Sequence, residues 1–157
     1  MLNKQSIRVE LERPSIRKFM EDHKGLLKGR VLDFGSGSQP YKDLVTGEYI
    51  PYDLDLKMPF GKFDVIICNQ VMQYITNPAE QIKDFYSLLN KDGLLIMTYP
   101  THWEEVELED LWRFTKTGMG FLLFRAGFKV IEHTERCSIP FEDFKLTIGY
   151  GVIAKRD

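Results

Sequence analysis

Asp33, Gly35 and Gly37 lie in the stretch VLDFGSGSQPY, residues 31–41, and have the types and spacing of a ligand-binding loop. Two glycines let the backbone turn tightly and come close to a bound molecule, because no Cβ stands in the way. A dinucleotide loop carries a third glycine for close helix packing, whereas Pro40 occupies the matching position here. Asp33 would also repel a phosphate and attract a cation. The loop therefore favours a cationic ligand, although a glycine pair alone is equally typical of an ordinary strand-to-helix turn.

Asp53 follows Asp33 by twenty residues and stands at the end of the next apolar run. An acidic side chain at that place in a nucleotide-binding fold accepts hydrogen bonds from both ribose hydroxyls. S-adenosylmethionine has a ribose, an ammonium and a sulfonium, so it fits both carboxylates. The two aspartates therefore favour this methyl donor as the cofactor over a dinucleotide.

The apolar pattern predicts strands that alternate with helices. Pro14 opens a helix that ends near Lys28, and Asn77 and Thr117 are the expected N-caps of two further helices. The expected strands are residues 30–34, 49–52, 63–68, 94–98, 128–132 and 145–154. This alternation indicates an α/β sheet with helices on both faces. Because no helix separates the last two strands, we expect an antiparallel edge.

Length and composition indicate one domain, residues 1–157, in which residues 1–29 form a helical cover. The formal net charge of −2 supplies no global field that would recruit nucleic acid or an anionic membrane. The sequence has no leader-like segment and no apolar run long enough to span a membrane. Cys68 and Cys137 are expected to be reduced. These features predict a cytoplasmic protein without a metal site.

Several ordered segments resemble those of class I S-adenosylmethionine-dependent methyltransferases, particularly the small type 11-like group. The resemblance covers about residues 30–132 and rests on VLDFGSGSQPY, PYDLD, FDVIICNQVMQYITNP, LLNKDGLLIMTYP and LWRFTKTGMGFLLFRAGF. It implies a Rossmann-like three-layer sandwich with a mostly parallel sheet. It also implies that the methionine portion of the donor is held by Asp33, Gly35 and Gly37, the ribose by Asp53, and the donor's other side by Asn69 and Gln70.

The sequence departs from the family between Asp53 and Phe63, where only nine residues, LDLKMPFGK, replace a helix, a strand and a return loop. A crossover with a helix needs about a dozen residues or more, so we expect the third strand to be absent and the sheet to have about six strands. Asp55 is the candidate to replace the family's adenine-contacting carboxylate, but a solvated turn aspartate is an equal alternative. The loss leaves the second strand open to pairing, so a dimer is one expectation.

Methyl transfer requires alignment of acceptor and methyl group and, for a hydroxyl acceptor, removal of a proton. His102 is the first candidate for the base because histidine titrates near neutral pH, but a surface histidine is an equal alternative. Tyr74 and Asp110 are weaker candidates, and Trp103 or Trp112 could form a wall of the acceptor site.

The charge beside the expected acceptor site disfavours nucleic acid as a substrate. Five acidic residues fall within seven positions there, namely Glu104, Glu105, Glu107, Glu109 and Asp110, and phosphates would meet like charge. A cluster of basic residues is interpreted as the solvent-exposed face of the first helix, and an RNA-binding role is left open. These residues are Arg13, Arg17, Lys18, Lys24 and Lys28.

We therefore expect a methyltransferase that acts on an oxygen or nitrogen of a small molecule or sugar. The alternative is a methyltransferase-fold binding protein, a scaffold or activator for a partner enzyme, that has lost turnover. A nicotinamide-dependent oxidoreductase is a third interpretation, which Pro40 disfavours.

Overall fold

The computed structural model describes residues 11–53, 56–105 and 109–157, which form one six-stranded sheet of order β2-β1-β3-β4-β6-β5. The strands are β1 (Lys28–Phe34), β2 (Thr46–Tyr52), β3 (Phe63–Asn69), β4 (Leu89–Pro100), β5 (Phe128–Pro140) and β6 (Lys145–Arg156). Strands β1 to β4 pair in parallel, and β6 runs antiparallel between β4 and β5. The predicted α/β class and the antiparallel pair at one edge are confirmed.

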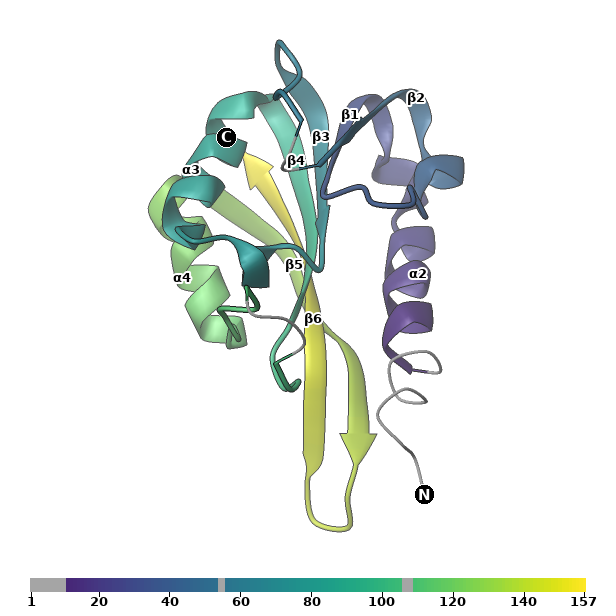
Figure 1. Ribbon diagram of the computed structural model, residues 1–157, viewed down its shortest axis with the longest axis vertical. Coiled ribbons are helices and arrows are strands. Elements are labelled where there is room, and N and C mark those ends of the chain that lie inside the picture. The colour runs from purple at the N-terminus through teal and green to yellow at the C-terminus, as the bar shows by residue number, and fades with distance from the viewer. Residues whose placement is uncertain (1–10, 54–55, 106–108) are drawn as a thin grey trace.

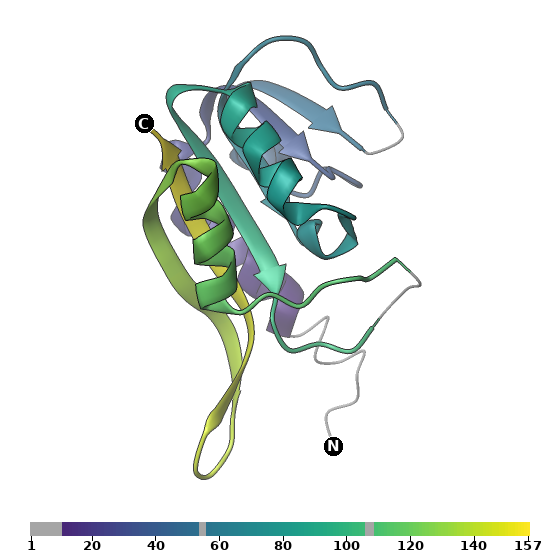
Figure 2. The ribbon, with the colours of Figure 1, turned by 90° about the vertical axis from the view of Figure 1, so that its left-hand side faces the viewer.

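Helices cover both faces of the sheet and make three layers (Figure 1). Helix α2 (Arg13–Asp22) lies on one face, and α3 (Pro78–Leu88) and α4 (Lys116–Ala126) lie on the other, in front of the sheet in Figure 2. Each face has its own apolar cluster, one around Phe34, Phe85 and Tyr99 and one around Met20 and Val31. Burial of these side chains fixes the two outer layers against the sheet.

Only the segment from Asp53 to Lys62 connects β2 to β3, so β2 is an edge strand, as the chain length predicts. Arg30 fastens this segment, because its Nη1 donates to the carbonyl oxygens of Phe60 at 2.8 Å and Lys62 at 3.1 Å. The connection therefore returns across β1 without adding a strand or helix among its described residues.

The chain after β1 also lacks an α-helix. Residues 35–45 contain only the 3-10 turn Lys42–Leu44 before β2 begins. The ordinary strand-to-helix turn, which was the alternative for the glycine loop, is therefore not what this sequence forms. The loop instead covers the ends of β1 and β2 directly.

Several element boundaries differ from those expected. Helix α2 ends at Asp22, and the apolar residues Leu26 and Leu27 belong to a 3-10 turn and its end instead of the helix. Strand β5 continues to Pro140 and forms with β6 a long hairpin that projects from the sheet in Figure 1. Bulges in β5 break the alternation of buried and exposed residues, which explains why its second half has no strand pattern.

The N-cap of α4 is Thr115, not the predicted Thr117. Thr115 has an extended backbone and its Oγ1 accepts a hydrogen bond from the Gly118 amide at 3.0 Å, whereas Thr117 lies within the helix. Asn77 caps α3 as expected, because its side chain accepts from the Glu80 amide at 3.3 Å and donates to the Glu80 carboxylate at 2.9 Å. Among the described residues no helix is long and apolar enough to cross a membrane.

Replacing Thr115 with alanine should lower the free energy of unfolding by about 1 kcal/mol, because one amide at the start of α4 loses its acceptor. Thr117→Ala, two residues away on the same exposed turn, should change it by no more than a few tenths of that amount. Urea unfolding of both variants measures the difference. An equal or larger loss at Thr117 would contradict the cap assignment.

Candidate functional site

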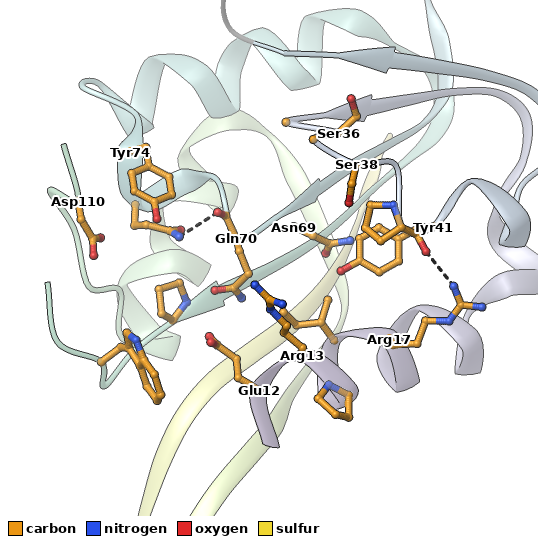
Figure 3. Close-up of a pocket in the computed structure, with 18 of the residues that line it drawn as sticks. Glu12, Arg13, Arg17, Ser36, Ser38, Tyr41, Asn69, Gln70, Tyr74 and Asp110 are labelled. Carbon is orange, nitrogen blue, oxygen red and sulfur yellow. Dashed lines mark hydrogen bonds between the residues drawn. The ribbon is translucent and has the colours of Figure 1, made fainter. Parts of the chain in front are cut away.

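A cavity of about 730 Å³ lies where the carboxyl ends of β1, β3 and β4 meet the start of α2. Its walls come from the start of α2, the glycine loop, the end of β3 with the turn that follows it, and the end of β4 with the segment that follows it. The lining residues are Glu12, Arg13, Pro14, Ile16, Arg17, Gly35, Ser36, Gly37, Ser38, Pro40, Tyr41, Asn69, Gln70, Gln73, Tyr74, Pro100, Trp103, Asp110 and Arg113. In Figure 3, Ser38 and Tyr41 lie toward one end of the cavity, Tyr74 and Asp110 lie at the other, and Arg13 and Glu12 lie between them. Ligands of open α/β sheets bind at this edge.

The glycine loop is tight at its first glycine and open at its second. Gly35 has φ +76°, and a Cβ there would lie 2.3 Å from Cγ2 of Val71. Gly37 has φ +46°, and a Cβ there would meet no atom within 4 Å. The amides of Gly35 and Ser36 both donate to the carbonyl oxygen of Tyr52, at 2.8 and 3.1 Å. The loop is thus bound to the end of β2, and its free side faces the cavity.

Asp33 lies behind this loop and is not among the residues that line the cavity. Its side chain is buried, and Oδ2 accepts a hydrogen bond from the hydroxyl of Tyr49 at 2.6 Å. Burial raises the pKa of Asp33 to about 6, against the opposing effect of the Tyr49 hydrogen bond. The carboxyl group is therefore held ready to change charge in the mildly acidic range.

Asp53 also binds the loop itself. Its Oδ1 accepts from the Gly37 amide at 3.1 Å and its Oδ2 accepts from the Ser36 hydroxyl at 3.3 Å. The carboxylate predicted for the ribose thus orders the second glycine of the loop. Asp55, predicted for the adenine, lies outside the described residues.

Asn69 and Gln70, which the resemblance assigns to the donor's other side, line the cavity. Asn69 Oδ1 accepts from the Thr98 hydroxyl at 2.9 Å, and Asn69 Nδ2 is buried without a partner among the described residues. Gln70 has φ +57°, which a non-glycine residue seldom adopts. A buried donor without an acceptor and a strained backbone both occur at ligand-binding sites.

Three arginines line the cavity, and two of them have carboxylate partners. Arg17 binds Asp43 through two hydrogen bonds of 2.9 and 2.6 Å, and Arg113 binds Asp110 through two of 2.5 and 2.7 Å. The Asp110 carboxylate raises the pKa of Arg113. Arg13 makes no hydrogen bond or ion pair with any residue in the described part of the chain. Its guanidinium is therefore the cation left for an anionic ligand group.

The structure brings two of the three predicted catalytic residues to the cavity. Tyr74 and Asp110 line the cavity, whereas His102 does not, because its Nδ1 lies 2.8 Å from the carbonyl oxygen of Thr147 on β6. The Asp110 side chain is only 2% exposed and is held by Arg113. None of the three combines access to the cavity with an unengaged basic atom.

Several residues of the cavity were not expected from the sequence as site residues, among them Glu12, Arg13, Arg17, Tyr41 and Gln73. The sequence interpretation treated Arg13 and Arg17 as a solvent-exposed helix face, but the position of α2 turns both toward the cavity. Burial raises the pKa of Tyr41 to about 12, so its phenol stays protonated at neutral pH. Gln73 Nε2 donates to the Gln70 carbonyl at 2.9 Å, while its Oε1 is buried without a partner within the described ranges. The position of Tyr41 at the end of the glycine motif was the sequence signal that could have placed this residue at the cavity.

The fold, with its glycine loop at the end of β1 and its antiparallel last strand, is that of the class I S-adenosylmethionine-dependent methyltransferases. A family model described as a methyltransferase domain matches residues 10–133. The chain therefore belongs to this methyltransferase family. A search of curated protein sequences found no match.

Solved structures with this fold share little sequence with the chain. An S-adenosylmethionine-dependent methyltransferase from Mesorhizobium loti is 15% identical with a TM-score of 0.63, over 92% of this chain and 97% of that one. Magnesium protoporphyrin IX methyltransferase from Synechocystis PCC 6803, with bound S-adenosylhomocysteine, is 14% identical with a TM-score of 0.62, over 100% and 89%. A complex of the Haloferax volcanii Trm112 methyltransferase activator with a candidate methyltransferase is also similar. Its sequence identity to this chain is 14% and the TM-score is 0.65, over 99% of both chains. These likenesses show the fold.

The family implies use of S-adenosylmethionine, and the described residues fit its amino-acid half. The cavity offers the uncompensated guanidinium of Arg13, the unpartnered amide nitrogen of Asn69 and the open space at Gly37. The guanidinium matches a ligand carboxylate, the amide nitrogen matches a hydrogen-bond acceptor of the ligand, and the open space lets the ligand approach the backbone closely.

The buried Asp33 should make folding stability depend on pH. Its pKa is near 4 when unfolded and about 6 when folded, so between these values the folded state holds the extra proton and stability falls as pH rises. Relative to Asp33→Asn, the wild type should lose roughly 2–3 kcal/mol of unfolding free energy between pH 4 and pH 7. Urea unfolding at several pH values measures this.

Tyr49→Phe supplies the matched comparison for Asp33. Without the Tyr49 hydrogen bond the pKa of Asp33 should rise further, so the loss of stability with pH should be larger than in the wild type. A wild type and an Asp33→Asn variant with parallel pH profiles would contradict the burial of an ionisable group there.

Proposed function

We propose that the protein transfers a methyl group from S-adenosylmethionine to an oxygen or nitrogen of a small molecule or sugar. The observation that supports this most is the continuity of the cavity. The glycine loop, the end of β3 and the polar segment after β4 line the same space. A donor held at the loop and an acceptor held near Trp103 would therefore meet within one enclosure, which is the alignment that methyl transfer requires.

The methionine half of the donor is assigned to the part of the cavity between the glycine loop and the start of α2. Arg13 would bind the carboxylate, and the loop at Gly37 would allow close approach of the chain that carries the sulfur. Asp33, behind the loop, would contribute negative charge opposite the ammonium and sulfonium once it is ionised. S-adenosylmethionine supplies the activated methyl group.

The nucleoside half is assigned to the outer side of the loop. Each oxygen of Asp53 accepts one hydrogen bond from the loop, and a carboxylate oxygen can accept a second. Asp53 can thus hold the ribose hydroxyls while it orders the loop. Asp55 remains the proposal for the adenine.

The acceptor is proposed to be small and without phosphate. Asp110 and Arg113 neutralise each other at the far end of the cavity, and Trp103 offers an aromatic surface. The exposed carboxylates Glu105 and Glu109 lie in the adjoining segment, where they would repel a polyphosphate backbone. A neutral alcohol, amine or sugar suits these walls best.

A scaffold without turnover is the second candidate. It is favoured by the engagement of Asp53 with the loop, which leaves the ribose fewer free acceptor sites than an unengaged carboxylate would offer. The neighbour that contains a methyltransferase activator shows that the fold occurs in a complex with such a partner. A scaffold of this kind would need the fold and not the donor.

Thermal unfolding with added ligand separates these candidates. S-adenosylmethionine or S-adenosylhomocysteine at a hundred times its dissociation constant should raise the midpoint by roughly 5–10 °C, because only the folded state binds it. NAD at the same concentration should give no shift. If neither sulfur compound moves the midpoint, the scaffold is favoured and donor binding is rejected.

Arg13→Gln tests the proposed carboxylate contact. S-adenosylhomocysteine should bind about tenfold more weakly, because a charge-assisted hydrogen bond is lost, whereas 5′-methylthioadenosine, which lacks the amino acid, should bind as to the wild type. Calorimetry gives both constants. Lys18→Gln, on an outer turn of the same helix, should change neither. Equal weakening of both ligands would contradict the assignment.

A further inference from the structure

We propose that Glu12 is the carboxylate that receives the proton from the methyl acceptor. The inference rests on the proposed methyltransferase function and adds the base that this function needs. The sequence interpretation placed this role on His102, Tyr74 or Asp110, and Glu12 was not among its candidates.

Glu12 stands directly before α2, and its side chain forms part of the cavity wall although the residue is only 6% exposed. In Figure 3 the Glu12 side chain lies near those of Gln70 and Arg13, between the residues at the two ends of the cavity. Donor-side residues lie toward one end and Asp110 toward the other. Glu12 is therefore placed where the two ligands would meet.

The Glu12 carboxylate has two polar neighbours, but they do not use all of its capacity to accept hydrogen bonds. The Gln70 amide, in the orientation that satisfies its neighbours, donates to Glu12 Oε1 at 3.3 Å, and Arg136 Nη2 lies 3.8 Å from the same oxygen. Both contacts are long compared with a charge-assisted hydrogen bond of 2.7–2.9 Å. Buried carboxylates normally accept several short hydrogen bonds, so Glu12 has acceptor capacity left for a ligand.

Arg136 positions this carboxylate from beneath. Its side chain is 1% exposed, and Nη1 donates to the backbone oxygen of Glu12 at 3.0 Å and to the hydroxyl of Ser15. The guanidinium passes over Gly149, where a Cβ would lie 2.4 Å from Nη2. Arg136 thus fixes the backbone of Glu12 and supplies a counter-charge, while leaving the carboxylate oxygens without a short bond.

The other candidates are less suited to accept a proton. Both oxygens of Asp110 receive hydrogen bonds from Arg113, so protonation would break a bidentate pair. His102 faces Thr147 outside the cavity, and Tyr74 offers a hydroxyl, which is a proton donor as well as an acceptor. Among the described residues that line the cavity, Glu12 is the carboxylate with the weaker engagement.

The step that Glu12 would serve is balanced in atoms and charge. A lone pair of the acceptor oxygen or nitrogen forms a bond to the methyl carbon, and the bond from that carbon to sulfur breaks with its electron pair left on sulfur. The acceptor's proton moves to Glu12 Oε and later exchanges with water. A carboxylate is a sufficient base because the acceptor atom becomes acidic as it takes up the methyl cation.

A binding experiment tests the position of the carboxylate without an acceptor. Sinefungin carries an amine at the place of the transferable methyl group, whereas S-adenosylhomocysteine carries nothing there. An anionic Glu12 facing that place should make the wild type bind sinefungin more tightly than S-adenosylhomocysteine, by about tenfold. Glu12→Gln should abolish this preference and leave the affinity for S-adenosylhomocysteine within about twofold. Calorimetry measures both affinities.

Asp110→Asn is the matched variant, because it neutralises the other cavity carboxylate by the same isosteric change. It should keep the preference for sinefungin. Loss of the preference in Asp110→Asn and not in Glu12→Gln would overturn the proposal. So would equal binding of both compounds by the wild type, a result that stands even if Glu12→Gln does not fold. Failure of the wild type to bind S-adenosylhomocysteine would instead reject the methyltransferase function on which the proposal rests.

Discussion

The buried guanidinium of Arg136 connects parts of the chain that are far apart in sequence. It reaches from β5 across β6 to the backbone of Glu12, 124 residues away. Together with the Gln70 amide, which donates to Glu12 Oε1, this contact attaches the start of α2 to the sheet at the cavity and holds the wall that carries Glu12 and Arg13. A buried, hydrogen-bonded charge of this kind specifies one arrangement more than it adds stability.

The fold could be predicted from the sequence because its signals are local. Apolar runs gave the strands, Asn77 and Pro78 gave the start of α3, and the nine residues after Asp53 are too few for a further strand and helix. Local signals failed where two candidates compete, as at Thr115 and Thr117, and where bulges interrupt the pattern of β5. In each case tertiary contacts decide between options that look equivalent in sequence.

The cavity was predicted only in part, for a related reason. Gly35, Gly37, Asn69 and Gln70 follow predicted strands, so strand order alone brings them to one edge of the sheet. Arg13 and Glu12 come from a helix whose rotation about its own axis is set by Phe19 and Met20 packing on the sheet. A sequence pattern gives the apolar face of such a helix but not the direction in which its first turn points. The sequence pattern therefore places Arg13 and Arg17, which lie at the edge of the apolar face, on the solvent-exposed side of the helix, although both line the cavity.

The absence of an α-helix after the glycine loop has an electrostatic consequence. In dinucleotide-binding folds the helix that follows the loop directs its positive dipole end, with several free amides, at the pyrophosphate. Here no such dipole exists, and the amides of Gly35, Ser36 and Gly37 already donate to Tyr52 and Asp53. A phosphate at these three residues would therefore meet neither a helix dipole nor a free backbone amide. Without a helix after the glycine loop, the backbone of this chain disfavours pyrophosphate cofactors as much as its side chains do.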